Sequence, residues 1–116
     1  MKDFKVVRGV YPTMITPYRD GKIDEEAVRE LVKFYWDSGC DGIFAACQSS
    51  EIMYLSVEER TTLVRLVVNT ARELAEADKS RPPMMIVASG HVSDSIADQA
   101  DDIQTHHLMK FSTSFV

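Results

Sequence analysis

The sequence predicts an α/β fold in which parallel strands alternate with helices. Two observations support this prediction. The first is that three apolar segments of strand length lie at residues 6–16, 42–46 and 84–88. The second is that segments with a helical apolar period follow the first two of them. A polar loop comes between each apolar segment and the next. This order is typical of βαβ units, whose right-handed crossovers place the strands in one parallel sheet.

The first strand is expected at residues 6–16, which are rich in β-branched and apolar residues and are followed by Pro17. Asp20 and Gly21 form a turn signal. The first helix is expected from Asp24, because this residue can act as an N-cap and apolar residues then recur at spacings of three and four. Gly39 is expected to lie just beyond its C-terminus.

The second strand is expected at residues 42–46, because this run is apolar without alternation and too short for a helix. Ser56 and Glu59 have the S-x-x-E spacing of a capping box, which predicts a helix over residues 56–76. Residues 84–88 predict a third buried strand.

The C-terminal part predicts a third helix over residues 94–104, after which the helical period stops. We therefore divide the chain into a (βα)3 segment at residues 1–105 and a tail at residues 106–116. The tail is expected not to continue the barrel-like pattern.

The composition excludes several classes of protein. The chain has 116 residues, of which 45% are hydrophobic and 27% charged, as in an ordinary globular domain. Its net charge of -5 and its lack of a basic run argue against nucleic-acid binding. No signal peptide or membrane-spanning segment is evident, so we expect a cytoplasmic protein. Cys40 and Cys47 would lie about 20 Å apart along a strand, which favours two reduced cysteines.

The polar loop after the second strand is the candidate ligand site. Residues 47–51 read CQSSE and lie between the strand and the capping box. In parallel α/β proteins, ligands bind at the carboxyl ends of the strands, where backbone N–H groups and side chains converge. The sequence therefore predicts that any binding chemistry lies in this loop.

Four segments together resemble a known family: GVYPTMITP at residues 9–17, DEEA at 24–27, GCDGI at 39–43, and Glu51 followed by LSVEER at 55–60. In this order they resemble the dihydrodipicolinate synthase and N-acetylneuraminate lyase family over residues 6–104. The resemblance implies the amino-terminal three βα units of a TIM (β/α)8 barrel. Members of that family condense or cleave pyruvate and an aldehyde through a Schiff base on a lysine, without a cofactor.

The resemblance also implies roles for the loop residues. In the family this loop reads Gly-Thr-Thr-Gly-Glu or Gly-Ser-Thr-Gly-Glu, and it holds the carboxylate of the keto acid. Ser49 stands at the carboxylate-binding hydroxyl and keeps its chemistry. Gln48 stands where many relatives have a hydroxyl that relays a proton, which an amide cannot do. Ser50 replaces a glycine, and any positive φ there would be strained. We expect Ser49, Ser50 and Gln48 to bind the substrate.

Three further residues are expected to support this site. Glu51 could act as a general base, but at a helix entry it more commonly holds loop amides and the helix dipole. Thr16 ends the first strand. His91 aligns with a family glycine and could face the same pocket, or could be a half-buried loop histidine with a satisfied ring nitrogen.

The family's Schiff-base lysine and its two tyrosines align beyond residue 116, so we expect this chain not to catalyse the reaction alone. Lys110 matches no family motif and is not expected to be a nucleophile. Asp102, His106 and His107 provide too few convergent ligands for a metal site.

Two main hypotheses for function remain open. One is a truncated pyruvate-dependent lyase or synthase, which would bind pyruvate or another 2-keto acid and would self-associate through unpaired sheet edges. The other is a non-catalytic interaction module that self-associates or docks on an intact family member. A free-standing α/β binding domain is a weaker third, because the sequence contains no GxGxxG or GxxxxGK fingerprint.

Overall fold

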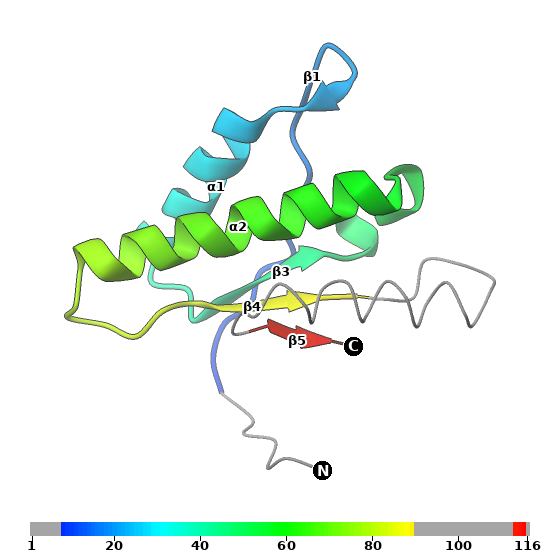
Figure 1. Cartoon of the computed structure of the whole chain (residues 1–116). Coiled ribbons are helices and arrows are strands. Elements are labelled where there is room, and N and C mark those ends of the chain that lie inside the picture. Colours follow the sequence, from blue (N-terminus) through cyan, green and yellow to red (C-terminus); the bar gives the residue numbers. More distant parts are fainter. Residues whose placement is uncertain (1–7, 90–112, 116) are drawn as a thin grey trace.

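The structure is a computed structural model that describes residues 8–89 and 113–115. Two helices lie on the same side of a small parallel sheet, and a short hairpin precedes the first helix (Figure 1). The elements in chain order are β1 (Tyr18–Arg19), β2 (Lys22–Ile23), α1 (Glu25–Asp37), β3 (Gly42–Ala46), η1 (Gln48–Ser50), η2 (Ile52–Tyr54), α2 (Val57–Ala77), β4 (Met85–Ala88) and β5 (Thr113–Phe115).

The sheet has the strand order β3-β4-β5, and both pairings are parallel. Gly42 pairs with Met85 at the start of β3, and the register shifts between Phe44 and Ala46. The helix α2 connects β3 to β4, which makes these three elements one βαβ unit. The predicted α/β pattern is therefore confirmed for the described residues, and β3 has the predicted bounds.

The predicted first strand at residues 6–16 is wrong in its extent. In the described part of this segment the structure has one isolated parallel bridge, between Thr13 and Phe44. The backbone still runs along β3, since Met14 N–H donates to Phe44 O at 2.9 Å and Phe44 N–H donates to Pro12 O at 2.9 Å. Pro12 has no N–H group of its own, so a regular ladder cannot form there.

The predicted turn at Asp20 and Gly21 is confirmed, and it closes the hairpin of β1 and β2. Both residues have a positive φ, of 53° and 75°. Two such residues form the type of turn whose twist matches that of the flanking strands. The hairpin therefore projects from the loop that enters α1.

The helix α1 begins as the sequence predicts. The Asp24 carboxylate accepts a hydrogen bond from Ala27 N–H at 3.1 Å, as an N-cap residue does. At the other end, Gly39 follows the C-cap residue Ser38 with a φ of 82°, which confirms its predicted place beyond the helix.

The capping box at the start of α2 is also confirmed. Glu59 N–H donates to Ser56 Oγ at 3.1 Å, and Ser56 N–H donates to Glu59 Oε1 at 3.0 Å. These hydrogen bonds, first the one from the Ser56 backbone, lower the pKa of the Glu59 carboxyl below its ordinary value. The reciprocal bonds fix the residue at which the chain leaves the polar loop and becomes helical.

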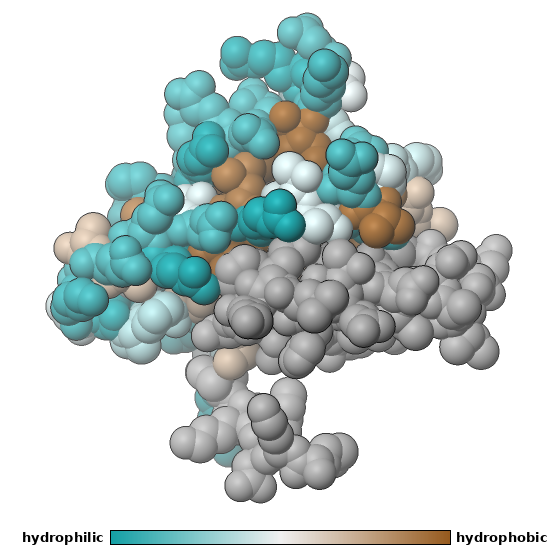
Figure 2. Space-filling view, in the orientation of Figure 1, coloured by the Kyte–Doolittle hydropathy of each residue, from teal (hydrophilic) through white to brown (hydrophobic). Residues whose placement is uncertain are grey.

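The core lies between the helices and the sheet. Each helix buries one apolar face, and the strands contribute the side chains that point toward it. In Figure 2 the coloured residues on view are mostly hydrophilic, with small hydrophobic areas between teal regions. Fully buried core side chains include Met14, Val28, Val32, Ile43, Ala45, Leu63, Val64, Val67 and Ala88.

Arg81 connects the C-terminal end of α1 to the segment that enters β4. Its guanidinium lies 3.8 Å from the centre of the Trp36 ring. The same group donates to Cys40 O at 2.8 Å and to the carbonyl oxygen of Trp36. This cation–π contact covers one face of the Trp36 ring.

Strand β5 is an element that the sequence does not predict, since it falls within the tail at residues 106–116. It pairs in parallel with β4, with Ile86 opposite Thr113. The predicted third helix at residues 94–104, and the predictions for His91, Lys110, Asp102, His106 and His107, fall outside the described residues. Within the described ranges, no helix is long and apolar enough to cross a membrane.

Candidate functional site

The candidate site is the loop that follows β3, at the carboxyl end of the strand. Cys47 ends the extended backbone, and the 3₁₀ helix η1 carries the next three residues. Gln48 and Ser49 are exposed, whereas Ser50 has an exposed fraction of 0%. The three neighbours predicted together as substrate-binding residues therefore differ in the structure: two are exposed and Ser50 is buried.

The Ser50 side chain is directed into the fold. Its Oγ lies 2.6 Å from Ala45 O and within hydrogen-bonding distance of Met14 O. It also accepts a hydrogen bond from Cys47 N–H at 3.3 Å. A hydroxyl has one proton, so it donates to one of the two carbonyl oxygens at a time. These contacts connect the loop to β3 and to the segment that precedes the hairpin.

Thr16 holds the same loop from the other chain segment. Its side chain is buried, with an exposed fraction of 7%, and its Oγ1 donates to Ser50 O at 2.7 Å. Ser50 is thus bound to residues 14–16 through both its hydroxyl and its carbonyl group. This contact is the way in which Thr16 would support the loop, as the sequence predicts.

Gln48 and Ser49 present hydrogen-bond donors at the surface. The carbonyl groups of Cys47 and Gln48 already accept hydrogen bonds within the loop: Ser50 N–H donates to Cys47 O, and Glu51 N–H donates to Gln48 O, each at 3.0 Å. The N–H groups of Gln48 and Ser49 have no acceptor within residues 8–89. The Ser49 hydroxyl and the Gln48 amide add further donors of the kind that bind an anionic oxygen.

Glu51 adopts the left-handed conformation, with φ 59° and ψ 34°. In the part of the chain that the structure describes, the non-glycine residues with positive φ are Asp20 and Glu51, so the positive φ falls one residue after Ser50. This conformation costs a residue with a Cβ atom about 1–2 kcal/mol. The Glu51 side chain is exposed, and the charge of its carboxylate acts on Tyr18.

Tyr18, in the hairpin strand β1, interacts electrostatically with carboxylates of this part of the chain. Burial raises the pKa of Tyr18 above its ordinary value, and the carboxylates of Glu51 and Glu59 raise it further. The hairpin thus brings a phenol to the side of the loop where two carboxylates lie. No local sequence signal predicts this proximity, because it depends on how the hairpin folds back.

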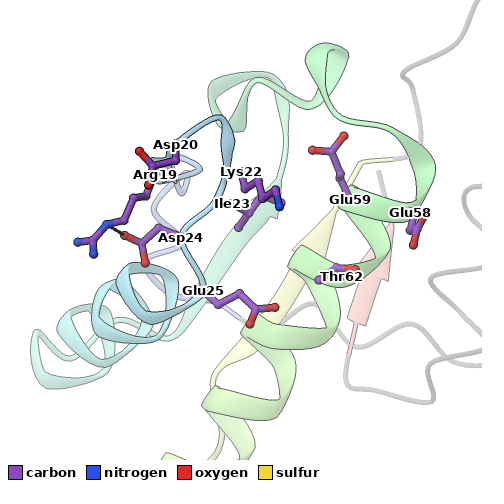
Figure 3. Close-up of a pocket in the computed structure, with 9 residues that line it drawn as sticks. All are labelled: Arg19, Asp20, Lys22, Ile23, Asp24, Glu25, Glu58, Glu59 and Thr62. Atoms are coloured by element: carbon purple, nitrogen blue, oxygen red, sulfur yellow. Dashed lines mark ion pairs between the residues drawn. The ribbon is translucent and has the colours of Figure 1, made fainter.

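A charged cleft of about 790 Å³ lies beside the loop, between the hairpin and the first turns of α1 and α2 (Figure 3). Arg19 forms an ion pair with Asp24 at 3.2 Å, and Asp24 and Glu59 also cap the two helices. Carboxylates outnumber basic groups in the lining, so the cleft repels anions. The lining residues are Arg19, Asp20, Lys22, Ile23, Asp24, Glu25, Glu58, Glu59 and Thr62.

We therefore take the loop at residues 47–51, and not the cleft, as the candidate site. The loop combines exposure with N–H groups that have no acceptor within residues 8–89, whereas two carboxylates of the cleft, Asp24 and Glu59, cap helices. Within residues 8–89, no three His, Cys, Asp or Glu side chains gather as metal ligands would. Cys47 is buried with a free thiol, and Cys40 is half-buried and also free.

Comparisons with known proteins agree on one family. The sequence model of the Dihydrodipicolinate synthetase family matches residues 6–76. A 4-hydroxy-tetrahydrodipicolinate synthase of Phenylobacterium zucineum is 40% identical over 65 residues, which are 56% of this chain and 22% of that protein. A probable 5-dehydro-4-deoxyglucarate dehydratase of Bacillus licheniformis is 35% identical over 68 residues, 58% of this chain and 22% of that protein.

The fold comparison gives a similar picture. The crystal structure of a dihydrodipicolinate synthase from Rhodopseudomonas palustris superposes with a TM-score of 0.77 and 18% identity. The superposition covers 94% of this chain and 33% of that one. The chain thus spans about a fifth of the length of the curated relatives that it matches, and about a third of this solved structure.

Proposed function

This chain belongs to the dihydrodipicolinate synthetase family, whose model matches more than half of it, and from this membership we propose that its loop at residues 47–51 binds the carboxylate of a 2-keto acid such as pyruvate. The resemblance identified in the sequence is thereby confirmed at the level of the family. The observation that supports the proposed function most is the exposed set of donors on Gln48 and Ser49, at the carboxyl end of β3.

The proposed chemistry is charge-assisted hydrogen bonding. The Ser49 hydroxyl and the N–H groups of Gln48 and Ser49 donate to the two carboxylate oxygens, and such bonds are about twice as strong as neutral ones. The Gln48 amide adds two donors on a side chain that cannot relay a proton. In this proposal the loop binds and orients the substrate and takes no part in proton transfer.

We further propose that this chain makes and breaks no carbon–carbon bond by itself. The resemblance places the Schiff-base lysine and two tyrosines of the family at positions that align beyond residue 116. Borohydride reduction in the presence of pyruvate tests this. We expect the mass of the chain to stay unchanged, whereas a stable pyruvate adduct on any lysine would contradict the proposal.

Binding is tested by titrating the ¹⁵N-labelled chain with pyruvate and following its amide resonances by NMR. We expect the amides of Gln48 and Ser49 to shift with a saturable dependence. Ser49→Ala should weaken this binding by about five- to tenfold, since it removes one charge-assisted hydrogen bond worth roughly 1 kcal/mol or more.

The matched control is Asn69→Ala, on the exposed side of α2, which should bind pyruvate like the original chain. Sodium chloride at the same ionic strength should leave the two amides unshifted. If Ser49→Ala binds pyruvate with unchanged affinity, the proposed carboxylate site is wrong.

A second candidate function, the interaction module, has an observation in its favour. Met53 and Tyr54 have exposed fractions of 73% and 84%, and Val57 of 50%, so three large side chains lie exposed beside the candidate site. Such a patch is typical of a surface that contacts another protein. Sedimentation of the chain and of its Met53→Ser, Tyr54→Ser variant over a range of concentrations tests it. We expect the variant to stay monomeric at concentrations where the original chain associates.

A further inference from the structure

We propose that Ser50, with Thr16, is a positioning residue that holds the Gln48–Ser49 turn in its binding conformation and does not itself contact the substrate. This inference rests on the proposed function of the loop. Ser50, predicted from the sequence to bind the substrate, then supports the residues that bind it, and the segment before the hairpin becomes part of the binding site.

The burial of Ser50 carries the first step. Its side chain has an exposed fraction of 0% although it lies in a polar surface loop between two exposed residues, Ser49 and Glu51. A buried hydroxyl without partners would destabilise the fold by about 1–3 kcal/mol. Ser50 has such partners in Met14 O, Ala45 O and Cys47 N–H. Contact with a ligand would require the hydroxyl to leave all three.

The second step is what these partners connect. Met14 and Ala45 belong to two adjacent parallel segments, and Cys47 is the last residue before the turn. The Thr16 hydroxyl binds the Ser50 carbonyl at 2.7 Å from the first of these segments. The turn is therefore fixed at its end by contacts with residues more than 30 positions away in the sequence.

The third step concerns the glycine that the family resemblance places at this position. A glycine there has no hydroxyl, so it cannot make the contacts with Met14 O, Ala45 O and Cys47 N–H that Ser50 makes. Ser50 adds a hydroxyl that joins the loop to β3 and to the segment before the hairpin, and the positive φ lies at Glu51. In this chain the buried hydroxyl of Ser50 thus helps to hold the loop in place.

The consequence for binding is preorganisation. A turn that is already held in place loses less conformational freedom when it binds a ligand, and the difference appears as affinity. Removing the Ser50 or Thr16 hydroxyl should therefore weaken binding even though neither contacts the ligand. A purely structural role would lower stability and leave the affinity of the folded chain unchanged.

The experiment measures pyruvate affinity by the amide shifts of Gln48 and Ser49, together with the free energy of unfolding in urea, for a set of variants of the full chain. Ser50→Ala and Thr16→Val remove the two hydroxyls. Thr16→Ser keeps the hydroxyl that binds Ser50 O. Val32→Ala, in the core face of α1 and away from the loop, lowers stability without touching the turn.

We expect Ser50→Ala and Thr16→Val to raise the pyruvate dissociation constant by about five- to tenfold, which corresponds to roughly 1 kcal/mol of lost preorganisation. Thr16→Ser should retain the original affinity. Val32→Ala should retain it as well, despite a loss of stability at least as large as that of the hydroxyl variants.

Two results would overturn the inference, and they are distinguishable. Unchanged affinity in Ser50→Ala and Thr16→Val, with Ser49→Ala weakened, would show that the carboxylate site exists and that the two buried hydroxyls do not position it. Unchanged affinity in Ser49→Ala would remove the proposed function and this inference with it. If Ser50→Ala does not fold, the Thr16→Val and Thr16→Ser pair decides the question.

Discussion

At the scale of single residues, Glu51 shows how the loop differs from a glycine-rich turn. It holds a left-handed conformation that glycine adopts without cost, and its carboxylate lies near Tyr18 without a hydrogen-bond partner among the described residues. The conformation persists because the neighbouring hydrogen bonds determine it: Glu51 N–H donates to Gln48 O, and Glu51 O accepts from Tyr54 N–H at 2.9 Å. Strain of this kind is common near binding sites.

Glu51→Gly should relieve this strain. We expect it to raise the free energy of unfolding by about 0.5–1 kcal/mol, because the gain at positive φ exceeds the added entropy of the unfolded chain. Urea denaturation measures the change. Glu51→Gln keeps the Cβ atom and loses the charge, so it should stay close to the original stability. A decrease in stability for Glu51→Gly would mean that the carboxylate contributes more than the strain costs.

Residue-level predictions from the sequence succeed where the signal is local. The roles of Asp24, Ser56 and Glu59 depend on neighbours three residues away, and the structure confirms all three. The burial of Ser50 depends on Met14, which lies 36 residues earlier, and no window of sequence around Ser50 contains that information. The proximity of Tyr18 to Glu51 escapes prediction for the same reason.

At the scale of elements, the start of α2 is fixed by the reciprocal hydrogen bonds of Ser56 and Glu59, and it makes stability depend on pH. The pKa of Glu59 is lower in the folded chain than in the unfolded chain because of its bonds to Ser56. A group of this kind stabilises the fold above its unfolded pKa, and the contribution is lost as the pH falls through the folded value.

The capping box can therefore be tested by comparing the original chain with Glu59→Gln at several pH values. Near neutral pH the original chain should be the more stable of the two. The difference should shrink as the pH falls from about 6 to about 3, the range in which a glutamate of lowered pKa takes up its proton. A difference that is constant over this range would contradict the assignment of the cap.

A second prediction at this scale concerns Arg81, which joins the end of α1 to the segment before β4. Arg81→Lys keeps the positive charge but loses the planar face over Trp36 and the forked donors to the two carbonyl groups. We expect a loss of about 1–2 kcal/mol in the free energy of unfolding. Arg65→Lys, on the exposed side of α2, is the control and should be neutral within about 0.5 kcal/mol.

A helix or strand could be predicted where its own residues contain the whole signal, and could not where the element depends on a distant pairing partner. The run at residues 42–46 predicts β3 with correct bounds, because a strand buried on both faces needs no polar alternation. The first strand was predicted too long, because propensity counts the apolar residues near Pro12 but not the missing N–H group. Strand β5 has three residues, and only its pairing with β4 defines it.

At the scale of the whole molecule, the described residues form an open parallel sheet with helices on one side and do not close into a barrel. Members of the family whose structures this chain resembles are about three times as long as the part that superposes. The side of the sheet away from α1 and α2 carries half-buried Phe44, Met85 and Val87. An open sheet of this kind favours association with further polypeptide.

We therefore expect the thermal midpoint of the chain to rise with protein concentration, because association stabilises the folded state by mass action. Calorimetry or circular dichroism over a hundredfold range of concentration measures it. The Met53→Ser, Tyr54→Ser variant is measured in parallel, because it changes the exposed patch beside the loop and leaves the sheet unchanged. A midpoint that is independent of concentration in the original chain would show that the open sheet is stable as a monomer.

The contact between Arg81 and Trp36 has a further consequence that is optical. Trp36 is the single tryptophan of the chain, and it is buried with an exposed fraction of 6%. The ultraviolet emission of the protein therefore comes mainly from one indole at the joint between α1 and the approach to β4, on the opposite side of the fold from Ser49. A shift of that emission to longer wavelength reports the opening of this joint, and pyruvate in the loop should leave the spectrum unaltered.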